Sequence, residues 1–394
     1  PRPLSVAAMT THTSLRRAAR VSLAAVVAGA CVLVPAVAPA APRDTLDLTP
    51  LGTYATGAWE EAAAEIVAFD KHTARLFVVN AQAGTVDVLD ASDPSDLTLV
   101  GVLETPGANS VAASHGLIAV AEAAEDAWDN GTVAFFDART LAQTGEVEAG
   151  ALPDMVTFTP NGKTVLVANE GEPEGYEEGQ IDPEGSVSVI DVTRGAARAT
   201  VRTAGFSAFD AAGLRAEGVR ISGPGATAAE DLEPEYIAVD KSGNTAYVTL
   251  QENNAMAIVD VRSATVTDIV PLSLKDHSVA GSGLDASDRD GAVNIAQWPV
   301  KGLYMPEGIA TYTSRGKTFT VTANEGDARE YDGWEDEARI KSLDLDPTAF
   351  PNAAELQEDE EIGRLNVVDD SPNTDGVYTE LWSYGARSIT IRDA

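Results

Sequence analysis

One pattern of alternating apolar and polar positions recurs five times along the chain. Each copy starts with a polar residue, alternates through small and branched apolar residues, turns at a polar cluster and continues as a second alternating run. The copies begin at Glu65, Asn109, Asp154, Glu235 and Glu307. A two-residue period interrupted by Gly and Asn is typical of β-hairpins. The pattern therefore predicts five hairpins.

A third apolar run usually follows each hairpin and ends in Asp. These runs cover residues 85–92, 132–139, 186–193 and 256–263. Three such strands followed by a fourth, repeated about every 40–50 residues, predict the four-stranded blades of a β-propeller. We therefore predict an all-β fold over residues 48–394, a propeller with YVTN/WD40-like blades.

Three stretches interrupt the repeat. They are residues 207–232, 276–304 and 325–365. The first includes a predicted short helix from about Ala211 to Gly218. Because the strand pattern resumes after each stretch, we interpret all three as insertions into one propeller and not as separate domains.

The last residues of the chain resemble the start of an inner strand. Gly385–Ile389 aligns with Gly107–Val111, and residues 48–57 look like an outer strand of the final blade. On this alignment the sequence contains about five blades and one strand of a sixth. We therefore expect a C-terminally truncated form of a ring that has seven blades when complete.

Residues 1–40 have the composition of a secretory signal. Arg16, Arg17 and Arg20 precede the apolar run 21–37, which ends in a small-x-small tripeptide,. Residues before Met9 read as upstream sequence. A twin-arginine signal or a lipobox at Cys31 are weaker alternatives. We expect export, to the medium or the cell surface, and no membrane span in the mature chain.

Composition narrows the possible partners and chemistry. The chain has 61 acidic and 27 basic residues, a formal charge of −34, and one cysteine, Cys31. Such an excess of carboxylates repels phosphate backbones, so no nucleic-acid partner is expected, and it favours divalent cations. A lone cysteine inside the signal excludes disulfides, thiolate catalysis and cysteine zinc sites from the predicted propeller.

Several long phrases resemble the choice-of-anchor I family. They include EPEYIAVDKSGNTAYVTLQENNAMAIVDV at 233–261, WPVKGLYMPEGIATY at 298–312 and VTANEGDAREYDGW at 321–334. The resemblance implies a secreted or surface-attached β-propeller with a family-dependent C-terminal anchor. It also implies a link to phosphatases, because some members are labelled alkaline phosphatases and others are fused to metallophosphatase or nucleotidase domains.

In a propeller, the starts of the inner strands and the ends of the second strands converge on one mouth of the central channel. The acidic residues at these places, or next to them, are the predicted metal ligands: Glu65, Asp154, Glu170, Glu172, Glu235, Glu307, Glu325 and Asp327. So many carboxylates need cations or raised pKa values. Oxygen ligands without His or Cys favour Ca²⁺ or Mg²⁺. The alternative is a solvated acidic rim.

Two further sets of residues are candidates for this chemistry. Arg387 is expected in the same ring, where it would clamp a phosphate or other anion, or neutralise a carboxylate. Asp285, Asp288 and Asp290 partly match an acidic Ca²⁺ loop, with a solvated turn as the alternative,. The loops Asn169–Glu172 and Asn324–Asp327 are near-duplicates that either bind a cation or only hold a turn.

The sequence leaves catalysis undecided. Asp70-Lys71-His72 matches the first metallophosphatase motif, but no Gly-Asn-His motif follows and the position predicts a turn,. No Gly-x-Ser-x-Gly motif or organic-cofactor motif is present. Three functions remain: a binding propeller for divalent cations and a small phosphorylated ligand or surface partner, a metal-dependent phosphomonoesterase, or a structural surface protein.

Overall fold

Strand pairing follows the repeat that the sequence predicts. The computed structural model describes residues 48–59 and 63–394. Residues 50–394 form one unit of contacts, and the predicted signal at 1–40 lies outside the described residues. The first four blades are antiparallel sheets whose four strands pair in sequence order. The all-β propeller fold is confirmed.

The strands of these blades have the following bounds. They are β1 (Val67–Asp70), β2 (Arg75–Asn80), β3 (Thr85–Asp90), β4 (Thr98–Glu104), β5 (Ala108–Ser114), β6 (Leu117–Glu122), β7 (Asn130–Asp137), β8 (Gln143–Ala151), β9 (Pro153–Phe158), β10 (Thr164–Asn169), β11 (Ser186–Asp191), β12 (Thr200–Gly205), β13 (Pro234–Val239), β14 (Thr245–Leu250), β15 (Ala255–Asp260) and β16 (Thr265–Pro271).

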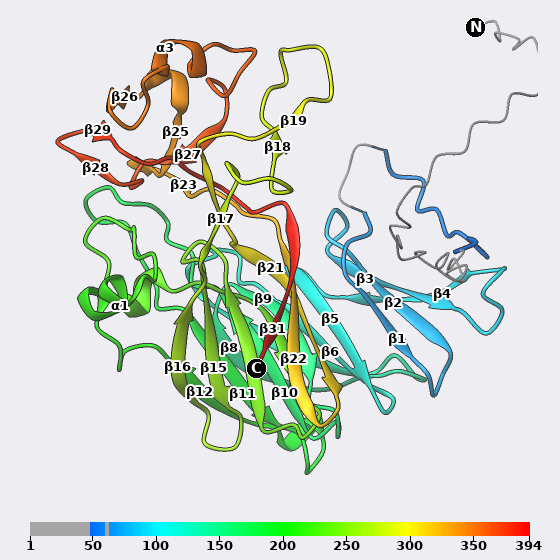
Figure 1. Cartoon of the computed structure of the whole chain (residues 1–394). Helices are drawn as coiled ribbons and strands as arrows, with labels where there is room; N and C mark the ends of the chain where they lie inside the picture. Colours follow the sequence, from blue (N-terminus) through cyan, green and yellow to red (C-terminus); the bar gives the residue numbers. More distant parts are fainter. Residues whose placement is uncertain (1–47, 60–62) are drawn as a thin grey trace, which may run out of the picture. The chain divides into compact units, whose positions relative to one another are not determined.

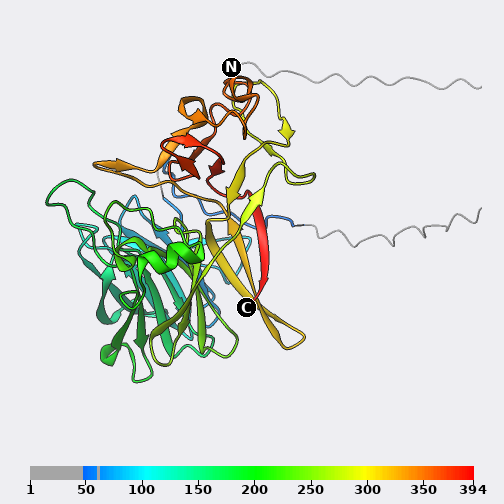
Figure 2. The same ribbon diagram turned by 60° about the vertical axis from the view of Figure 1, so that its left-hand side comes forward.

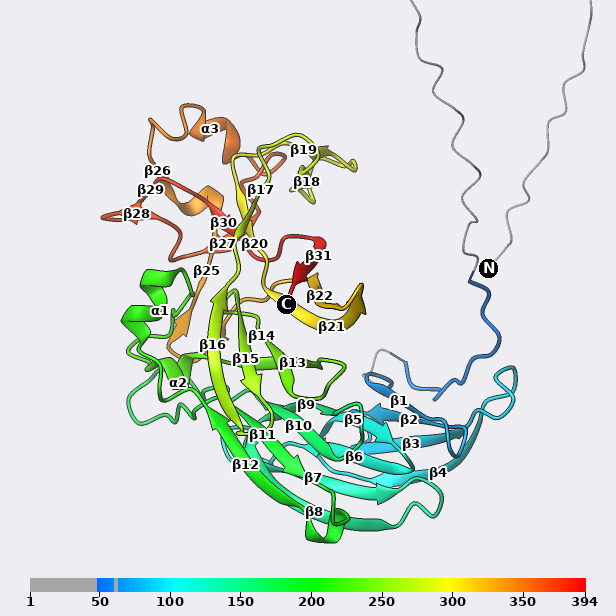
Figure 3. The same cartoon turned by 60° about the horizontal axis from the view of Figure 1, so that its bottom comes forward.

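Apolar side chains from both faces of each sheet hold consecutive blades together. The inner strands β1, β5, β9 and β13 contact one another in order, as Figure 3 shows. One buried cluster lies between each pair of these blades; between the third and fourth, Leu166, Val187 and Val189 meet Ile237 and Val248. Burying such a side chain stabilises the fold by about 1.5–3 kcal/mol. The alternation of the strands thus fixes the blade order.

The fifth blade differs from the prediction. It contains β21 (Pro306–Ser314), β22 (Lys317–Asn324) and β31 (Ser388–Asp393), and β31 pairs with β22 as a third strand. Figure 2 shows β31 in red beside β22 in yellow. Assigning Ser388–Asp393 to the inner strand of a sixth blade was wrong. The physical reason is that Asn324 pairs with Ser388 as Asn169 pairs with Ser186, so the strand continues the fifth sheet.

Within the part of the chain that the structure describes, one face of the fifth blade is uncovered. The apolar residues of β31 that correspond to Val187 and Val189 are Ile389 and Ile391. They are 76% and 59% exposed, whereas Val187 and Val189 are fully buried against the next blade. In the described residues, β31 also has no fourth strand beside it.

The segment 48–57 is not an outer strand in the structure. It contains no strand, and its backbone at Gly52 lies against the loop at Pro94 and Ser95, beside the first blade. The expected pairing with the final blade was therefore wrong. Leu48 and Leu51 stay exposed, because no sheet accepts the segment.

The insertion between the third and fourth blades is helical, as its sequence predicts. It holds α1 (Ala211–Glu217) and α2 (Ala228–Asp231), while the 3-10 helix η1 (Ala196–Arg198) precedes β12. Asp210 caps the start of α1, and Gly218 ends it with a φ of 98°, a conformation that glycine adopts without strain,. Thr227 and Glu230 form a capping box on α2,.

The other two insertions pack together into one lobe, defined here as residues 274–304 and 327–384. Its sheet has the order β17-β20-β30-β27-β25, so both insertions contribute strands. The elements of the lobe are β17 (Leu274–Asp276), β18 (Leu284–Asp285), β19 (Ile295–Ala296), β20 (Lys301–Leu303), β23 (Glu330–Tyr331), β24 (Trp334–Glu335), β25 (Glu337–Arg339), η2 (Ile340–Ser342), β26 (Asp344–Leu345), α3 (Ala353–Leu356), β27 (Asn366–Val368), β28 (Asn373–Thr374), β29 (Val377–Tyr378) and β30 (Trp382–Ser383). Figure 1 shows them gathered beside the blades.

The lobe has its own hydrophobic core. Trp298 from the first insertion packs with Phe350, Leu356 and Val367 from the second. Two stretches that the repeat pattern treats as separate excursions therefore form one body. The second stretch of the lobe, from residue 327 onward, begins just after the end of β22, where the acidic residues of the fifth blade lie.

Candidate functional site

Acidic side chains from three blades and the lobe surround one cavity. This acidic cavity has a volume of about 380 Å³. Its carboxylates are Asp154, Glu170, Glu172, Glu235, Glu252, Glu307, Glu325 and Asp327. A second cavity of about 260 Å³ shares Asp154 and Glu307 with it and adds Glu65 and Asn109. The structure thus brings all eight predicted channel-face acids together around two adjoining cavities.

β-Bulges point the first acid of the inner strands toward the channel. In the third blade, Asn169 pairs with Pro153 and Ala168 with Met155, so Asp154 is the extra residue of a bulge. The same register shift surrounds Glu235 in the fourth blade and Glu307 in the fifth. A bulged residue leaves the ladder and its side chain turns away from the sheet. The repeat therefore places a carboxylate at the same point of successive blades.

The near-duplicate loops combine a structural Asn and Gly with acids that face the cavity. Asn169 is buried, and its amide donates to the hydroxyls of Ser186 and Ser188. Asn324 donates in the same way to Ser388 and Thr390. These amides tie the end of the second strand to the third. In these loops the asparagines hold the turn, whereas the acidic residues line the cavity.

Glycine is required where the second loop meets the lobe. Gly326 has a φ of 86°, and a side chain there would collide with the backbone of Gly385. The two backbones can approach only because both residues lack a Cβ. This contact holds Glu325 and Asp327 at the wall that the acidic cavity shares with the lobe.

In two pairs of neighbouring carboxyl groups in the acidic cavity, one member raises the pKa of the other. Burial and the nearby Glu235 raise the pKa of Glu170 well above its ordinary range. Burial and the nearby Glu252 do the same to the pKa of Glu235. Burial, together with the hydrogen bond from Glu325, raises the pKa of Glu307 to about 7. One proton shared within each pair is the arrangement expected when no other cation is near.

Other acids of the cavity are affected mainly by burial. Burial, with Glu172 and Glu65 nearby, raises the pKa of Asp154 to about 6. Burial raises the pKa of Glu252 to about 7, and its Oε2 has no hydrogen-bond partner within the described part of the chain. Tyr331 donates a 3.2 Å hydrogen bond to Glu172. The cavity therefore disfavours negative charge on most of its carboxyl groups.

The metal geometry itself is not preformed. Across residues 48–59 and 63–394, no three Asp, Glu, His or Cys side chains are arranged as ligands of one metal ion. Neither His nor Cys is found among the described residues that line the two acidic cavities. An ion that binds here would meet oxygen donors only, the set that suits Ca²⁺ and Mg²⁺.

Arg387 is not part of the predicted ring. It precedes the third strand of the fifth blade and lines a separate cavity of about 550 Å³, at the junction with the lobe. Its neighbours there include Arg339 and Arg364, while Glu325 and Asp327 border both this cavity and the acidic one. The expected position in the ring was wrong because β31 is a third strand and not an inner one.

The candidate calcium loop is engaged in other contacts. Both carboxylate oxygens of Asp288 accept hydrogen bonds from Arg364, at 2.6 and 3.1 Å. Asp290 accepts from the backbone of Ala292. Asp285 lines the junction cavity with Arg387. The structure does not gather these three acids around one point.

The structure also places the Asp-x-His match in a turn. Asp70 is buried, and its carboxylate accepts from the backbone and hydroxyl of Thr73 and from the backbone of Gly116. All these bonds stabilise the turn and its contact with the second blade. The prediction of a turn is confirmed.

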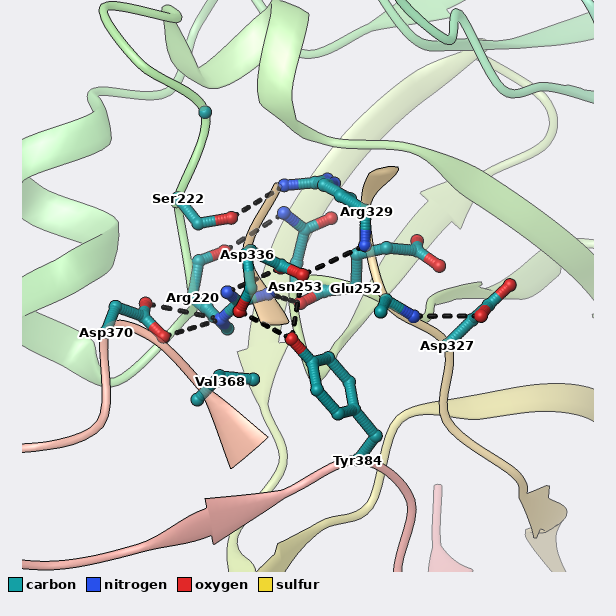
Figure 4. Close-up of polar contacts among 12 residues, drawn as sticks. Arg220, Ser222, Glu252, Asn253, Asp327, Arg329, Asp336, Val368, Asp370 and Tyr384 are labelled. Atoms are coloured by element: carbon teal, nitrogen blue, oxygen red, sulfur yellow. Dashed lines mark hydrogen bonds and ion pairs between the residues drawn. The ribbon is translucent and has the colours of Figure 1, made fainter. Parts of the chain in front are cut away.

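Sequence reasoning missed a buried arginine beside the acidic cavity. Arg329 is 2% exposed and lines the cavity. Its guanidinium donates to Asp231 at 3.1 Å, to Glu233 at 2.7 and 2.9 Å and to Ser222 at 2.9 Å. These partners come from α2 and the residues around it, so Arg329 joins the lobe to the first insertion. Figure 4 shows the contact between Arg329 and Ser222.

A second buried arginine lies next to it. Arg220 contacts Asp336 at 2.7 Å, an ion pair without hydrogen-bond alignment, and reaches Asp370 at 3.1 Å. Tyr384 donates to Asp336 at 2.7 Å. We use the name arginine network for Arg220, Arg329 and their carboxylate partners Asp231, Glu233, Asp336 and Asp370. Figure 4 labels both arginines, Asp336 and Asp370. An Arg within the acidic phrase at 321–334 was the only available signal in the sequence.

The family model of the choice-of-anchor I domain matches residues 65–394. No curated protein matches the sequence. None of the helices in the described residues is long and apolar enough to cross a membrane.

Similar solved structures share little sequence with this chain. Hydrazine synthase of Kuenenia stuttgartiensis is 16% identical, with a TM-score of 0.35, over 66% of this chain and 80% of that one. The β-propeller domain of Cps50 (Swd1) from Myceliophteria thermophila is 12% identical, with a TM-score of 0.38, over 67% and 81%. A functionally unknown protein of Desulfotomaculum acetoxidans is 12% identical, with a TM-score of 0.39, over 66% and 62%. Similarities this weak carry no functional argument.

Proposed function

Since this chain belongs to the choice-of-anchor I domain family, we propose that it is an exported or surface-attached β-propeller that binds divalent cations in its acidic cavity. The eight carboxylates around that cavity are the observation that carries the proposal. Among the described residues that line this cavity, Arg329 is the only basic one, and Asp231 and Glu233 already neutralise it. Negative charge on the remaining acids needs another partner.

Cation binding replaces the protons that the carboxyl groups share. A divalent ion near Glu170 and Glu235, or near Glu307 and Glu325, attracts both members of a pair and releases the proton between them. The paired carboxylates become ligands of the metal ion once their side chains rotate toward it. Ca²⁺ is the favoured ion because it accepts irregular sets of six to eight oxygens, whereas Mg²⁺ demands an octahedron.

Thermal unfolding of the full chain at pH 8 tests this function. We expect CaCl₂ to raise the Tm and excess EDTA to reverse the effect. A ligand at a hundred times its Kd stabilises the folded state by about 2.7 kcal/mol. Glu170→Gln combined with Glu235→Gln should remove most of this stabilisation, because the pair loses both negative charges.

The matched control is Glu104→Gln on the outer strand β4, which removes one exposed charge and lines neither acidic cavity. It should respond to CaCl₂ like the unmodified protein. An equal Tm with CaCl₂ and with EDTA would show that the cavity binds no calcium, and would favour a structural surface protein.

A second candidate is a metal-dependent phosphomonoesterase. The specific observation is that Glu325 and Asp327 border both the acidic cavity and the junction cavity with Arg387. A phosphate could contact Arg387 while an ion on these carboxylates polarises it. Hydrolysis of p-nitrophenyl phosphate that EDTA abolishes, and that Glu325→Gln and Arg387→Gln each reduce, would establish this activity. Calcium binding without hydrolysis would exclude the phosphomonoesterase and support the cation-binding propeller.

A further inference from the structure

The acidic cavity is larger than one metal ion and its ligands require. Its volume of about 380 Å³ equals that of about a dozen water molecules in the liquid. That size falls within the range of small-molecule sites. No three side chains of the described residues converge on a single point there. The cavity has room for an extended ligand that contacts several carboxyl groups in turn.

The carboxyl groups are distributed along the walls in separate pairs. Glu170 with Glu235 and Glu307 with Glu325 form two such pairs. Asp154 raises the pKa of a member of each pair, so it lies within electrostatic reach of both. Carboxyl groups from three blades and the lobe line this one cavity, so a ligand with several positive charges can contact more of them than a single ion can.

A buried acceptor on the wall lacks a donor. Glu252 is 7% exposed and lines the cavity, and its Oε2 accepts no hydrogen bond from the described residues. A buried polar atom without a partner costs about 1–3 kcal/mol. An ammonium group carries three donors and would supply the missing bond.

Tyrosine rings line the same space. Tyr331 borders the acidic cavity, and its hydroxyl is held by Glu172. Tyr236 lines the adjoining cavity with Glu65, Asp154 and Glu307. The ring face attracts alkylammonium groups and covers methylene chains. A hydrated metal ion gains much less from such a wall.

We propose that the acidic cavity binds a linear alkylamine with two or more protonated nitrogens, a small polyamine. This inference rests on the proposed function, because the same carboxylates bind either kind of cation. The ammonium groups donate hydrogen bonds to the paired carboxyls and to Glu252. The methylene segment between them lies against Tyr331.

Calorimetric titration of the full chain with spermidine, at fixed NaCl and with EDTA present, tests the proposal. We expect 1:1 binding at least tenfold tighter than that of butylamine, which carries one charge. CaCl₂ should compete with spermidine. Glu252→Gln and Tyr331→Leu should each weaken spermidine binding at least fivefold, while Tyr331→Phe keeps the ring and most of the affinity.

Two variants separate a built site from general charge attraction. Tyr331→Leu and Tyr331→Phe should bind Ca²⁺ with equal affinity, because both lose the hydroxyl that donates to Glu172 and the ring itself gives a metal ion nothing. Glu104→Gln, outside the cavity, should leave both ligands unaffected. If Glu252→Gln and Tyr331→Leu bind spermidine like the unmodified protein, the amine binds elsewhere and the proposal falls.

The outcomes also distinguish this proposal from the calcium function. Calcium binding without spermidine binding would overturn the amine site and leave the proposed function intact. Spermidine binding without calcium binding would support the amine site and overturn the proposed calcium function. Tetralysine presents the same ammonium groups on a peptide. If it binds more tightly than spermidine, the site belongs to a basic peptide, and the assignment to a small polyamine is overturned.

Discussion

Two neighbouring groups of carboxylates are neutralised in different ways. In the arginine network, Asp231 and Glu233 meet Arg329, and Asp336 and Asp370 meet Arg220. In the acidic cavity, carboxyl groups meet mainly one another. The two groups share a wall, since Arg329 contacts the first and lines the second.

The two groups differ in what neutralises them: fixed arginine side chains in the arginine network, and exchangeable protons or dissolved cations in the acidic cavity. A carboxylate with an arginine counter-ion is neutralised at every pH at which the protein is folded, because arginine stays protonated. A carboxylate with another carboxyl as neighbour needs a proton or a dissolved cation. The arginine network therefore holds the lobe in place, and the acidic cavity is left free to exchange its cations.

The largest effect is expected from removing the counter-ion. Arg329→Met leaves Asp231 and Glu233 buried without a positive partner, and breaking a buried pair in this way costs about 3–5 kcal/mol. The free energy of unfolding, measured by urea denaturation, should fall by that amount.

Arg364→Met is the matched control for Arg329→Met. It removes an arginine whose partner Asp288 is exposed on the lobe, so stability should change little. Equal stability of Arg329→Met and the unmodified protein would show that the arginine network carries no stabilising charge.

A smaller effect is expected from pH. With EDTA present, the free energy of unfolding should fall as the pH rises from about 4.5 to about 7. Glu252 and Glu307 have pKa values near 7 when folded and near 4.5 when unfolded. The folded state therefore binds more protons in this window, and stability is lost as they leave. One unit of pKa corresponds to about 1.4 kcal/mol. With the share of the half-exposed Glu307 discounted for solvent screening, the loss should be on the order of 3 kcal/mol.

Two measurements on the same pH series sharpen this prediction. Saturating CaCl₂ should flatten the fall, because the ion replaces the lost protons. Glu252→Gln should reduce it, because one titrating group is gone. Stability that rises through this window would contradict the raised pKa values.

The smallest effect is expected in the candidate calcium loop. Asp288→Asn and Asp290→Asn should leave the calcium titration unchanged. Asp288 already pairs with Arg364, and Asp290 already accepts a hydrogen bond from the backbone of its own turn. A measurable loss of affinity would move the cation site from the acidic cavity to the lobe.

Much of the fold and of the acidic cavity could be predicted from the sequence. The two-residue period and the Asp at each third strand fix the blades, and the blade repeat then places Asp154, Glu235 and Glu307 at equivalent points. The same rule could have identified β31, because it ends in Asp393 like the other third strands. The similarity of Gly385–Ile389 to Gly107–Val111 was misleading, since both are glycine turns before a strand.

The arginine network could not be predicted from local pattern. Arg329 and Asp231 lie 98 positions apart, and Arg220 and Asp370 lie 150 positions apart. Their contact depends on how two insertions of irregular sequence pack, and no periodicity encodes that packing. Glu252 was recognisable as a strand-end acid, but its missing donor is visible only in three dimensions.

In the described residues, the outer edge of strand β31 has no partner strand, and Ile389 and Ile391 on it are exposed. An apolar edge of this kind pairs readily with any extended strand that reaches it, whether from this chain or from another molecule. Ile391→Lys should weaken such pairing, because a charge on an edge strand opposes the addition of a further strand.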